Sequence, residues 1–148
     1  MNKRFAITLL AMANLLLLAT PSSAHHSFAA EFDASKLVAI TGTLTKLEWS
    51  NPHIYFYVDV KEPGGQITTW TFEGANTGPI KRAGTSRLDF VNNFGKTVTV
   101  YACPAKVTPH RAAAEQVKLP DGRIVVSGGR RYNGDRDKAL QSLKAVEE

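Results

Sequence analysis

Residues 41–60 read TGTLTKLEWSNPHIYFYVDV, and their alternation predicts two β-strands joined at a short polar corner. In the second half of the stretch, the apolar side chains fall on one face of an extended chain and the intervening side chains on the other. The apolar set is Ile54, Phe56, Val58 and Val60. A period of two is typical of a strand with one buried face. The stretch therefore predicts a β-rich fold built around this hairpin.

The first strand of the hairpin is predicted to be long and bent. Apolar residues up to Leu44 keep one alternation, whereas Leu47 and Trp49 keep the opposite one. One extra residue in the strand, a β-bulge near Thr45-Lys46, would produce this change of phase. We therefore expect the strand to bend at this point.

The remaining segments predict a small barrel. Further strands are expected over residues 67–73, 96–103, 112–119 and 123–126, with a loop over 74–84 and one short helix over 85–93, in which Leu88 and Val91 share a face. Three meandering strands, a connection with a helix and further strands are typical of a mainly β, five-stranded, partly open barrel of the oligonucleotide/oligosaccharide-binding (OB) type. A small β-sandwich is the alternative architecture.

The start of the chain predicts a cleaved signal peptide over residues 1–24. Two basic residues, Lys3 and Arg4, precede an apolar run over residues 5–19, and a stretch of small residues ends at Ala24. This three-part pattern is typical of secretory signals. The apolar run is shorter than the roughly 20 residues that span a bilayer. We therefore expect a periplasmic or secreted protein without a transmembrane segment after cleavage.

The processed chain divides into three predicted parts. Residues 25–36 form an N-terminal lead-in arm, residues 37–127 form the barrel domain, and residues 128–148 form a charged, mobile tail. Phe28 and Phe32 are expected to pin the arm to the domain.

Charge and cysteine content exclude several function classes. The 18 basic and 13 acidic residues leave a modest excess of positive charge, and no run of Lys and Arg with interleaved aromatic residues is present, so nucleic-acid binding is not expected. The lone Cys103 forms no intramolecular disulfide and is expected to be buried in a strand. No nucleophile elbow, phosphate loop or paired-carboxylate pattern indicates an enzyme.

A metal site is predicted from the histidines. Cleavage after Ala24 would make His25 the first residue, so that its α-amine and imidazole chelate one metal ion. The turn at Asn51-Pro52 presents His53, whose imidazole would supply a third nitrogen. Such a set, a histidine brace, suits Cu(II). His26 offers a competing mode of binding to the same ion.

Other interpretations of the histidines stay open. The pair at the start could be a polar beginning to a disordered arm, and His53 could hydrogen-bond across its turn. Glu31 and Asp33 are candidates for carboxylates that orient a ligating imidazole. Zinc is less favoured, since a structural zinc site needs four protein ligands at recognisable spacing. His110 is expected to be a solvated turn residue.

A second hypothesis is a binding module without metal. The predicted ligand-binding residues are Trp49, Asn51, Tyr55 and Tyr57. Aromatic rings on an exposed barrel face would offer stacking surfaces, and nearby basic residues would attract a small anionic ligand or an envelope polymer. The basic set is Lys46, Lys81, Arg82 and Arg87. The sequence predicts no particular protein partner.

Several of these motifs occur together in one known family. The chain combines an HHSF start, the W-x-N-P-H corner, TWTFEG, GKTVTVYACPAK and an LPDGR turn between residues 25 and 123. In this it resembles the small exported bacterial proteins grouped as domain of unknown function 6152. The resemblance implies an exported, single-domain, β-rich protein, and it assigns no activity or catalytic residue.

Overall fold

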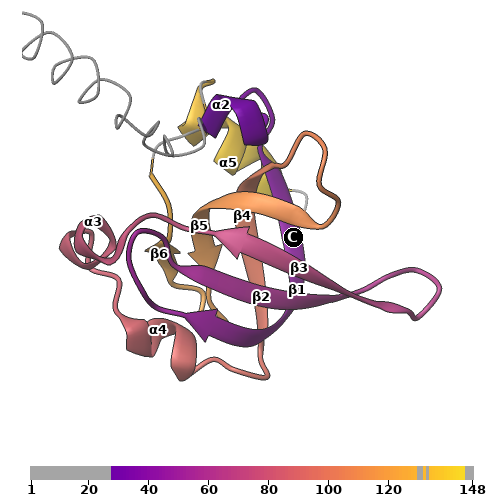
Figure 1. The fold of residues 1–148 in the computed structure, drawn as a ribbon. Helices are drawn as coiled ribbons and strands as arrows, with labels where there is room; N and C mark the ends of the chain where they lie inside the picture. The colour runs from indigo at the N-terminus through magenta and orange to yellow at the C-terminus, as the bar shows by residue number, and fades with distance from the viewer. Residues whose placement is uncertain (1–27, 130–131, 133, 146–148) are drawn as a thin grey trace, which may run out of the picture.

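Six β-strands form the centre of the chain in the computed structural model, which describes residues 28–129, 132 and 134–145 (Figure 1). They are β1 (Val38–Glu48), β2 (Tyr55–Lys61), β3 (Ile67–Glu73), β4 (Thr97–Pro104), β5 (Arg111–Lys118) and β6 (Ile124–Val126). The predicted signal peptide lies outside the described residues, as do His25 and His26.

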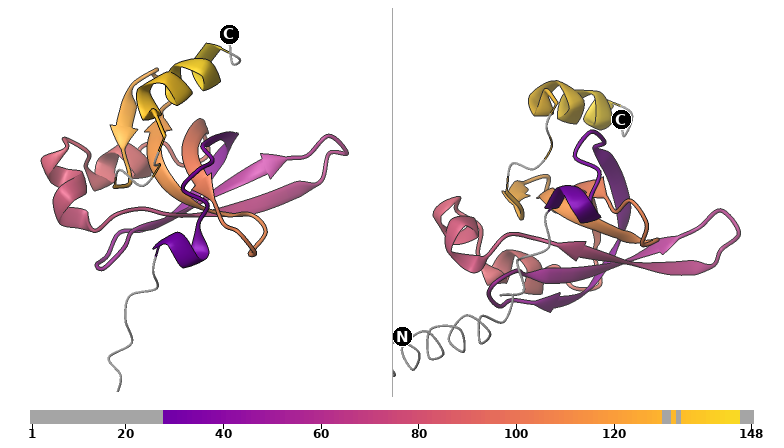
Figure 2. Two further views of the ribbon diagram at one scale, coloured as in Figure 1. Left: turned by 90° about the horizontal axis from the view of Figure 1, so that it is seen from above. Right: turned by 45° about the horizontal axis from the view of Figure 1, so that its top comes forward.

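The first five strands close into a barrel. β1 pairs antiparallel with β2 and β4, β2 pairs with β3, and β4 pairs with β5. A parallel pairing of β3 with β5, which includes Phe72 opposite Ala112, completes the ring, and β6 extends it outside β5. This order confirms the predicted OB-like barrel. The β2–β3 hairpin extends well beyond the barrel (Figure 2).

The predicted bulge in β1 is confirmed. Leu44 lies opposite Val58, whereas Lys46 lies opposite Tyr57, so one residue of β1 is left without a counterpart. Just before it, Gly42 allows β1 to pass close to β2, because a Cβ at this position would lie 2.4 Å from the Asp59 carbonyl oxygen. β1 can therefore bend and pair with both β2 and β4 in the barrel.

The helices correct two predictions. α3 (Thr77–Arg82) forms where a loop was expected, with the Asn76 side chain accepting a hydrogen bond of 3.1 Å from the Gly78 amide. Pro79 does not prevent this helix, because proline is tolerated in a first helical turn, where its missing N–H has no partner in the helix. α2 (Phe28–Glu31) forms in the lead-in arm, where no helix was predicted.

α4 (Arg87–Val91) forms within residues 85–93, where a short helix was predicted, but it buries a different face. Leu88 is 59% exposed, while Phe90 is fully buried. The helix is only five residues long, so its orientation is decided by one buried ring, that of Phe90, which packs against Phe56 of β2. α3 and α4 lie next to each other at one end of the barrel (Figures 1 and 2).

The main core is aromatic at its centre. The Phe56 ring lies 5.3 Å from that of Phe72 and 5.2 Å from that of Phe90, measured between ring centroids. A smaller cluster contains Phe32, Cys103 and partly buried Phe28. The expectations that Phe28 and Phe32 pin the arm and that Cys103 is buried are therefore confirmed.

The C-terminal segment forms α5 (Arg136–Ala145), in which Leu140 is buried. Its mobility in solution stays a prediction. Among the helices of the described residues, none combines the length and hydrophobicity needed to cross a membrane.

An acid-sensitive contact secures α4. The Asp89 carboxylate accepts hydrogen bonds from the Ser86 amide at 2.7 Å and from Arg123 Nη1 at 3.0 Å. Burial acts to raise the pKa of Asp89, but the hydrogen bonds from the Ser86 backbone and from Arg123 outweigh burial and hold the pKa below its usual value. This contribution to stability is therefore present above the usual aspartate pKa and is lost as the pH falls through the lowered one.

Asp89→Asn is expected to lower the free energy of unfolding by about 1–2 kcal/mol at neutral pH, because a helix cap and an ion pair are lost together. The difference from the wild type should shrink as the pH falls below about 4. Urea unfolding across this pH range measures it. Asp121→Asn is the control, since Asp121 contacts the same Arg123 at 2.8 Å but is 54% exposed. A deficit that persists unchanged in acid would contradict the assignment.

Candidate functional site

A polar row of four side chains joins the N-terminal arm to the corner before β2. We use the name polar row for Glu31, Arg111, Glu73 and His53. Arg111 Nη2 lies 2.7 Å from Glu31 Oε1 and 3.1 Å from Glu73 Oε2. Glu73 Oε1 in turn lies 3.5 Å from His53 Nδ1. Charged groups of alternating sign therefore run continuously from α2 to the histidine.

Barrel closure brings the polar row together. Arg111 opens β5 and lies opposite Thr71 of β3 in the parallel pairing. Glu73 is two residues further along β3, so it points to the same face as Thr71 and comes within reach of the guanidinium. Tyr55 lies opposite Glu73 in the β2–β3 pairing, which places the His53 corner beside the same carboxylate.

The His53 ring is held in one orientation. Its Nδ1 lies 3.0 Å from the Gly74 carbonyl oxygen. A carbonyl oxygen only accepts hydrogen bonds, so Nδ1 carries a proton and donates it. In neutral imidazole the lone pair is then on Nε2. Metal-ligating histidines typically have this arrangement, with the non-ligating nitrogen bound to a carbonyl or carboxylate oxygen.

Both tyrosines predicted to bind ligand have carboxylate partners. The Tyr55 hydroxyl donates to Glu73 Oε2 at 3.3 Å, and the Tyr57 hydroxyl donates to Glu48 Oε1 at 3.0 Å. Burial, followed by the charge of Glu73, raises the pKa of Tyr55. Lys46 Nζ lies 4.7 Å from the centre of the Tyr57 ring. One face of that ring is thus covered by an ammonium group.

The other two predicted ligand-binding residues make structural contacts. The Trp49 ring packs on Phe90, with 6.0 Å between ring centroids. The Asn51 side-chain oxygen accepts hydrogen bonds from the Thr77 amide and hydroxyl at 3.1 and 2.9 Å, and so ties the corner to α3. Ligand binding by these residues stays a prediction.

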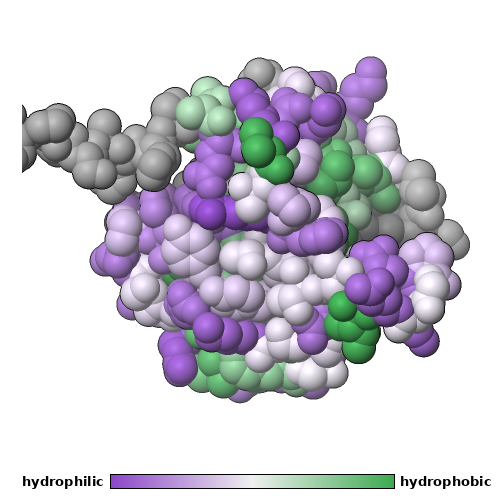
Figure 3. Space-filling view, turned by 45° about the vertical axis from the view of Figure 1, so that its right-hand side comes forward, coloured by the Kyte–Doolittle hydropathy of each residue, from purple (hydrophilic) through white to green (hydrophobic). Residues whose placement is uncertain are grey.

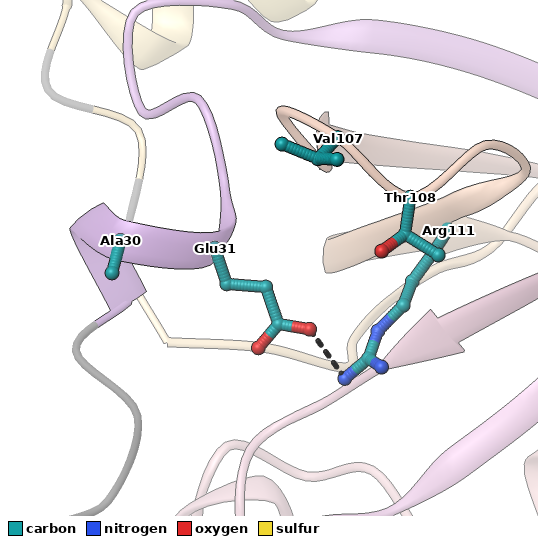
Figure 4. A pocket seen from close by; sticks show the side chains of 5 residues that line it. All are labelled: Ala30, Glu31, Val107, Thr108 and Arg111. Carbon is teal, nitrogen blue, oxygen red and sulfur yellow. Dashed lines mark ion pairs between the residues drawn. The ribbon is translucent and has the colours of Figure 1, made fainter.

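A pocket of about 480 Å³ adjoins the polar row. It lies between α2 and the β4–β5 loop and is lined by Ala30, Glu31, Val107, Thr108 and Arg111. Figure 4 shows the Glu31 carboxylate and the Arg111 guanidinium pointing toward each other, with Val107 and Thr108 on the loop beside them. The face seen in Figure 3 has its hydrophobic residues in separate patches among polar ones.

The predicted metal ligands are only partly described. Within residues 28–129, 132 and 134–145, no three His, Cys, Asp or Glu residues form a group that could hold a metal ion. His110 lies against Trp70, edge to face at 5.4 Å, and is exposed. Of the three predicted metal ligands, the structure therefore describes His53 alone. Glu31, which was expected to orient a ligating imidazole, is connected to His53 only through Arg111 and Glu73.

Sequence reasoning missed Arg111 and Glu73. The alternation of β3 places Glu73 opposite in phase to Phe72, which could have marked it as a side chain of the outer face. Its partner Arg111 is 38 residues away in the chain, and no local pattern indicates that contact.

Comparison with known proteins identifies the family of the barrel. No curated protein matches the chain. One protein family matches residues 12–114, a region that begins before the described residues, ends within β5 and contains the whole polar row. This match agrees with the motifs of the hairpin and the corner. The chain belongs to DUF6152, a family of unknown function.

Proposed function

We propose that the chain is exported, is cleaved after Ala24 and binds Cu(II), acting in copper carriage or sequestration. In this proposal His25 supplies its α-amine and imidazole, His53 supplies Nε2, and His26 provides an alternative imidazole. The observation that carries the proposal is the docking of the arm, through Glu31 and Arg111, beside the carboxylate next to His53.

Several contacts fix the arm on the barrel. The Lys106 amide donates to the Glu31 carbonyl oxygen at 2.9 Å, and Lys106 Nζ donates to the Ala29 carbonyl oxygen at 2.6 Å. The Phe32 ring is 2% exposed. Because α2 begins at Phe28, His25 lies three residues before a docked element, and three extended residues span roughly 10 Å. The chain start is thus confined to within roughly 10 Å of the docked α2.

The chemistry of the donors favours copper. Nitrogen ligands follow the Irving–Williams order, in which Cu²⁺ binds most tightly among the divalent first-row ions. The α-amine has a reference pKa of about 7.7–8.0, so binding must displace a proton and should weaken as the pH falls. The Gly74 carbonyl keeps the His53 lone pair on Nε2, which agrees with a ligand role.

The test is Cu(II) titration of protein that begins at His25, followed by electron paramagnetic resonance. We expect one-to-one binding. One alanine added before His25 should weaken the affinity at least about 100-fold, which is more than the loss of a hydrogen-bond partner of a metal ligand causes. His53→Gln should also weaken binding and alter the nitrogen hyperfine pattern. His110→Gln is the matched control and should leave both unchanged.

Two results would contradict the proposal. Affinity that is indifferent to the added alanine would remove the α-amine from the site. Mass spectrometry of the protein from a periplasmic fraction tests processing, and a chain that retains residues 1–24 would exclude His25 as the terminal ligand.

Binding of an anionic ligand on the outer barrel face is a second candidate function. The pocket beside Arg111 has the size of a small-molecule site, but an anionic ligand there would have to compete with Glu31 and Glu73 for the guanidinium. Lys46 contributes less than expected, since its ammonium pairs with Glu48 at 2.6 Å.

A further inference from the structure

We propose that the open edge of β3 pairs two copies of this chain into an antiparallel dimer. The edge belongs to the β2–β3 hairpin, which extends beyond the barrel (Figure 2). β3 pairs along its whole length with β2, but only its residues 71–73 pair with β5 on the other side. Among the described residues, no strand pairs with residues 67–70 on that side. The inference goes beyond copper binding and does not depend on it.

The backbone groups of Ile67 and Thr69 face the open side of β3. The Thr71 amide donates to the His110 carbonyl oxygen at 2.9 Å, so Thr71 directs its N–H away from β2. Successive residues of a strand direct their backbone groups to opposite sides, and the β2–β3 register runs without a shift. Ile67 and Thr69 therefore direct their N–H and C=O groups to the same side as Thr71. Both side chains are exposed, Ile67 to 64%.

The sequence of this edge favours pairing with another strand. Exposed edges are typically protected by lysine, proline or a bulge. Residues 67–70 read ITTW, which contains none of these and consists of residue types that favour strands. The other edge of the hairpin, in β2 beyond its pairing with β1, carries Lys61. The β3 edge is therefore the side of the hairpin on which a strand can be added.

A second copy fits this edge because the edge is complementary to itself. With a two-fold axis at Thr68, Ile67 lies opposite Thr69 of the second copy, and these two residues exchange both backbone hydrogen bonds. The Thr68 side chains meet at the axis, and cross-strand threonine pairs are stabilising. A register that places Ile67 opposite Thr71 would need the Thr71 amide, which is already bonded to His110. The register with Thr68 at the axis is therefore favoured over this one.

The charges beside the edge are arranged for the same pairing. On β2, Lys61 lies opposite Ile67, and Asp59 lies opposite Thr69 and accepts a hydrogen bond of 2.6 Å from its hydroxyl. In the dimer, each row of side chains across the joined sheet begins at Lys61 of one copy and ends at Asp59 of the other. The two ends of a row thus carry opposite charges, which is the complementarity expected of two copies related by a two-fold axis.

The first experiment is sedimentation of the chain that begins at His25, without copper, over a range of concentrations. The interface is small, so we expect a dissociation constant between about 1 μM and 1 mM. Thr69→Pro should raise the constant at least about tenfold, because one edge N–H is lost from each copy. Proline is tolerated where the N–H of an edge strand faces solvent, so the pairing with β2 should survive.

Thr69→Val is the matched control for the proline variant. It removes the hydroxyl contact with Asp59 but keeps the edge N–H, so the dissociation constant should stay within about threefold of the wild type. Circular dichroism checks that both variants fold.

A charge exchange at the two-fold axis tests the register. Thr68→Lys and Thr68→Glu should each weaken self-association about fivefold, because like charges would lie directly opposite each other. An equimolar mixture of the two variants should associate at least as tightly as the wild type, since opposite charges then meet at the axis. The same pair of substitutions at Thr45, an exposed threonine of β1, is the control and should leave association unchanged.

Amide exchange locates the interface on the chain. Raising the concentration of the wild type should slow exchange of the Ile67 and Thr69 amides, which face the second copy. The Thr68 and Trp70 amides face β2 and should exchange at the same rate at both concentrations.

Three results would overturn the proposal. A wild type that stays monomeric at about 1 mM would exclude the dimer, and the edge would then be open to an extended peptide of another protein. A dimer that a folded Thr69→Pro protein forms as tightly as the wild type would place the interface elsewhere. If Thr69→Pro does not fold, the Thr68 pair decides: a mixture of its two variants that associates no better than either alone would contradict the register.

Discussion

Replacing Phe56 by alanine is expected to lower the free energy of unfolding by about 3–5 kcal/mol. The ring is fully buried, is stacked on Phe72 of β3 at 5.3 Å and packs at a tilt against Phe90 of α4 at 5.2 Å. Its removal would leave a cavity where the barrel wall meets the helix that covers one end. Chemical denaturation monitored by circular dichroism measures the loss.

Phe94→Ala is the matched control for this substitution. It removes the same atoms from a side chain that is 40% exposed, so the expected loss is about 1 kcal/mol or less. Equal losses at the two positions would show that the Phe56 ring is not the centre of the core.

Gly74→Ala is expected to cost about 2–3 kcal/mol, because the position has no room for a side chain. A Cβ at Gly74 would lie 2.4 Å from the Ser127 carbonyl oxygen and 2.5 Å from Ile54 Cγ1. The Ser127 carbonyl cannot simply turn away, since it accepts a hydrogen bond of 3.0 Å from the Ala75 amide. The midpoint of chemical denaturation reports the change.

The same substitution also affects the site, because the Gly74 carbonyl orients His53. Gly64→Ala in the β2–β3 turn is the control, since no atom lies within 4 Å of a Cβ there. It should change stability by about 0.5 kcal/mol or less. A Gly74→Ala protein as stable as Gly64→Ala would mean that the segment around Ser127 packs less closely than the structure shows.

The strands could be predicted from the sequence because alternation is a local property. Ile54, Phe56 and Val58 are all buried, as their spacing indicated. Likewise, the change of phase after Leu44 located the bulge in β1. In each case one face of the strand is buried regardless of which strands pair with it. The alternation of apolar side chains is therefore visible in a few consecutive residues.

The helices show where local patterns fail. A loop was predicted over residues 74–84, yet α3 forms there with Asn76 as its cap. In α4 the spacing of Leu88 and Val91 indicated one face, while the structure buries Phe90. A helix of one or two turns has little stability of its own, so packing against the barrel decides whether it forms and which face it buries.

The sequence by itself determined the strand order, the bulge, the corner before His53 and the family of this protein. Only the tertiary structure decided that Arg111 meets Glu31 of the arm and Glu73 of β3, and that Glu73 lies next to His53. The physical reason is the parallel pairing of β3 with β5, which brings Glu73 and Arg111 together although they are 38 positions apart in the chain. No periodicity within a strand indicates such a contact, because it depends on how the barrel closes.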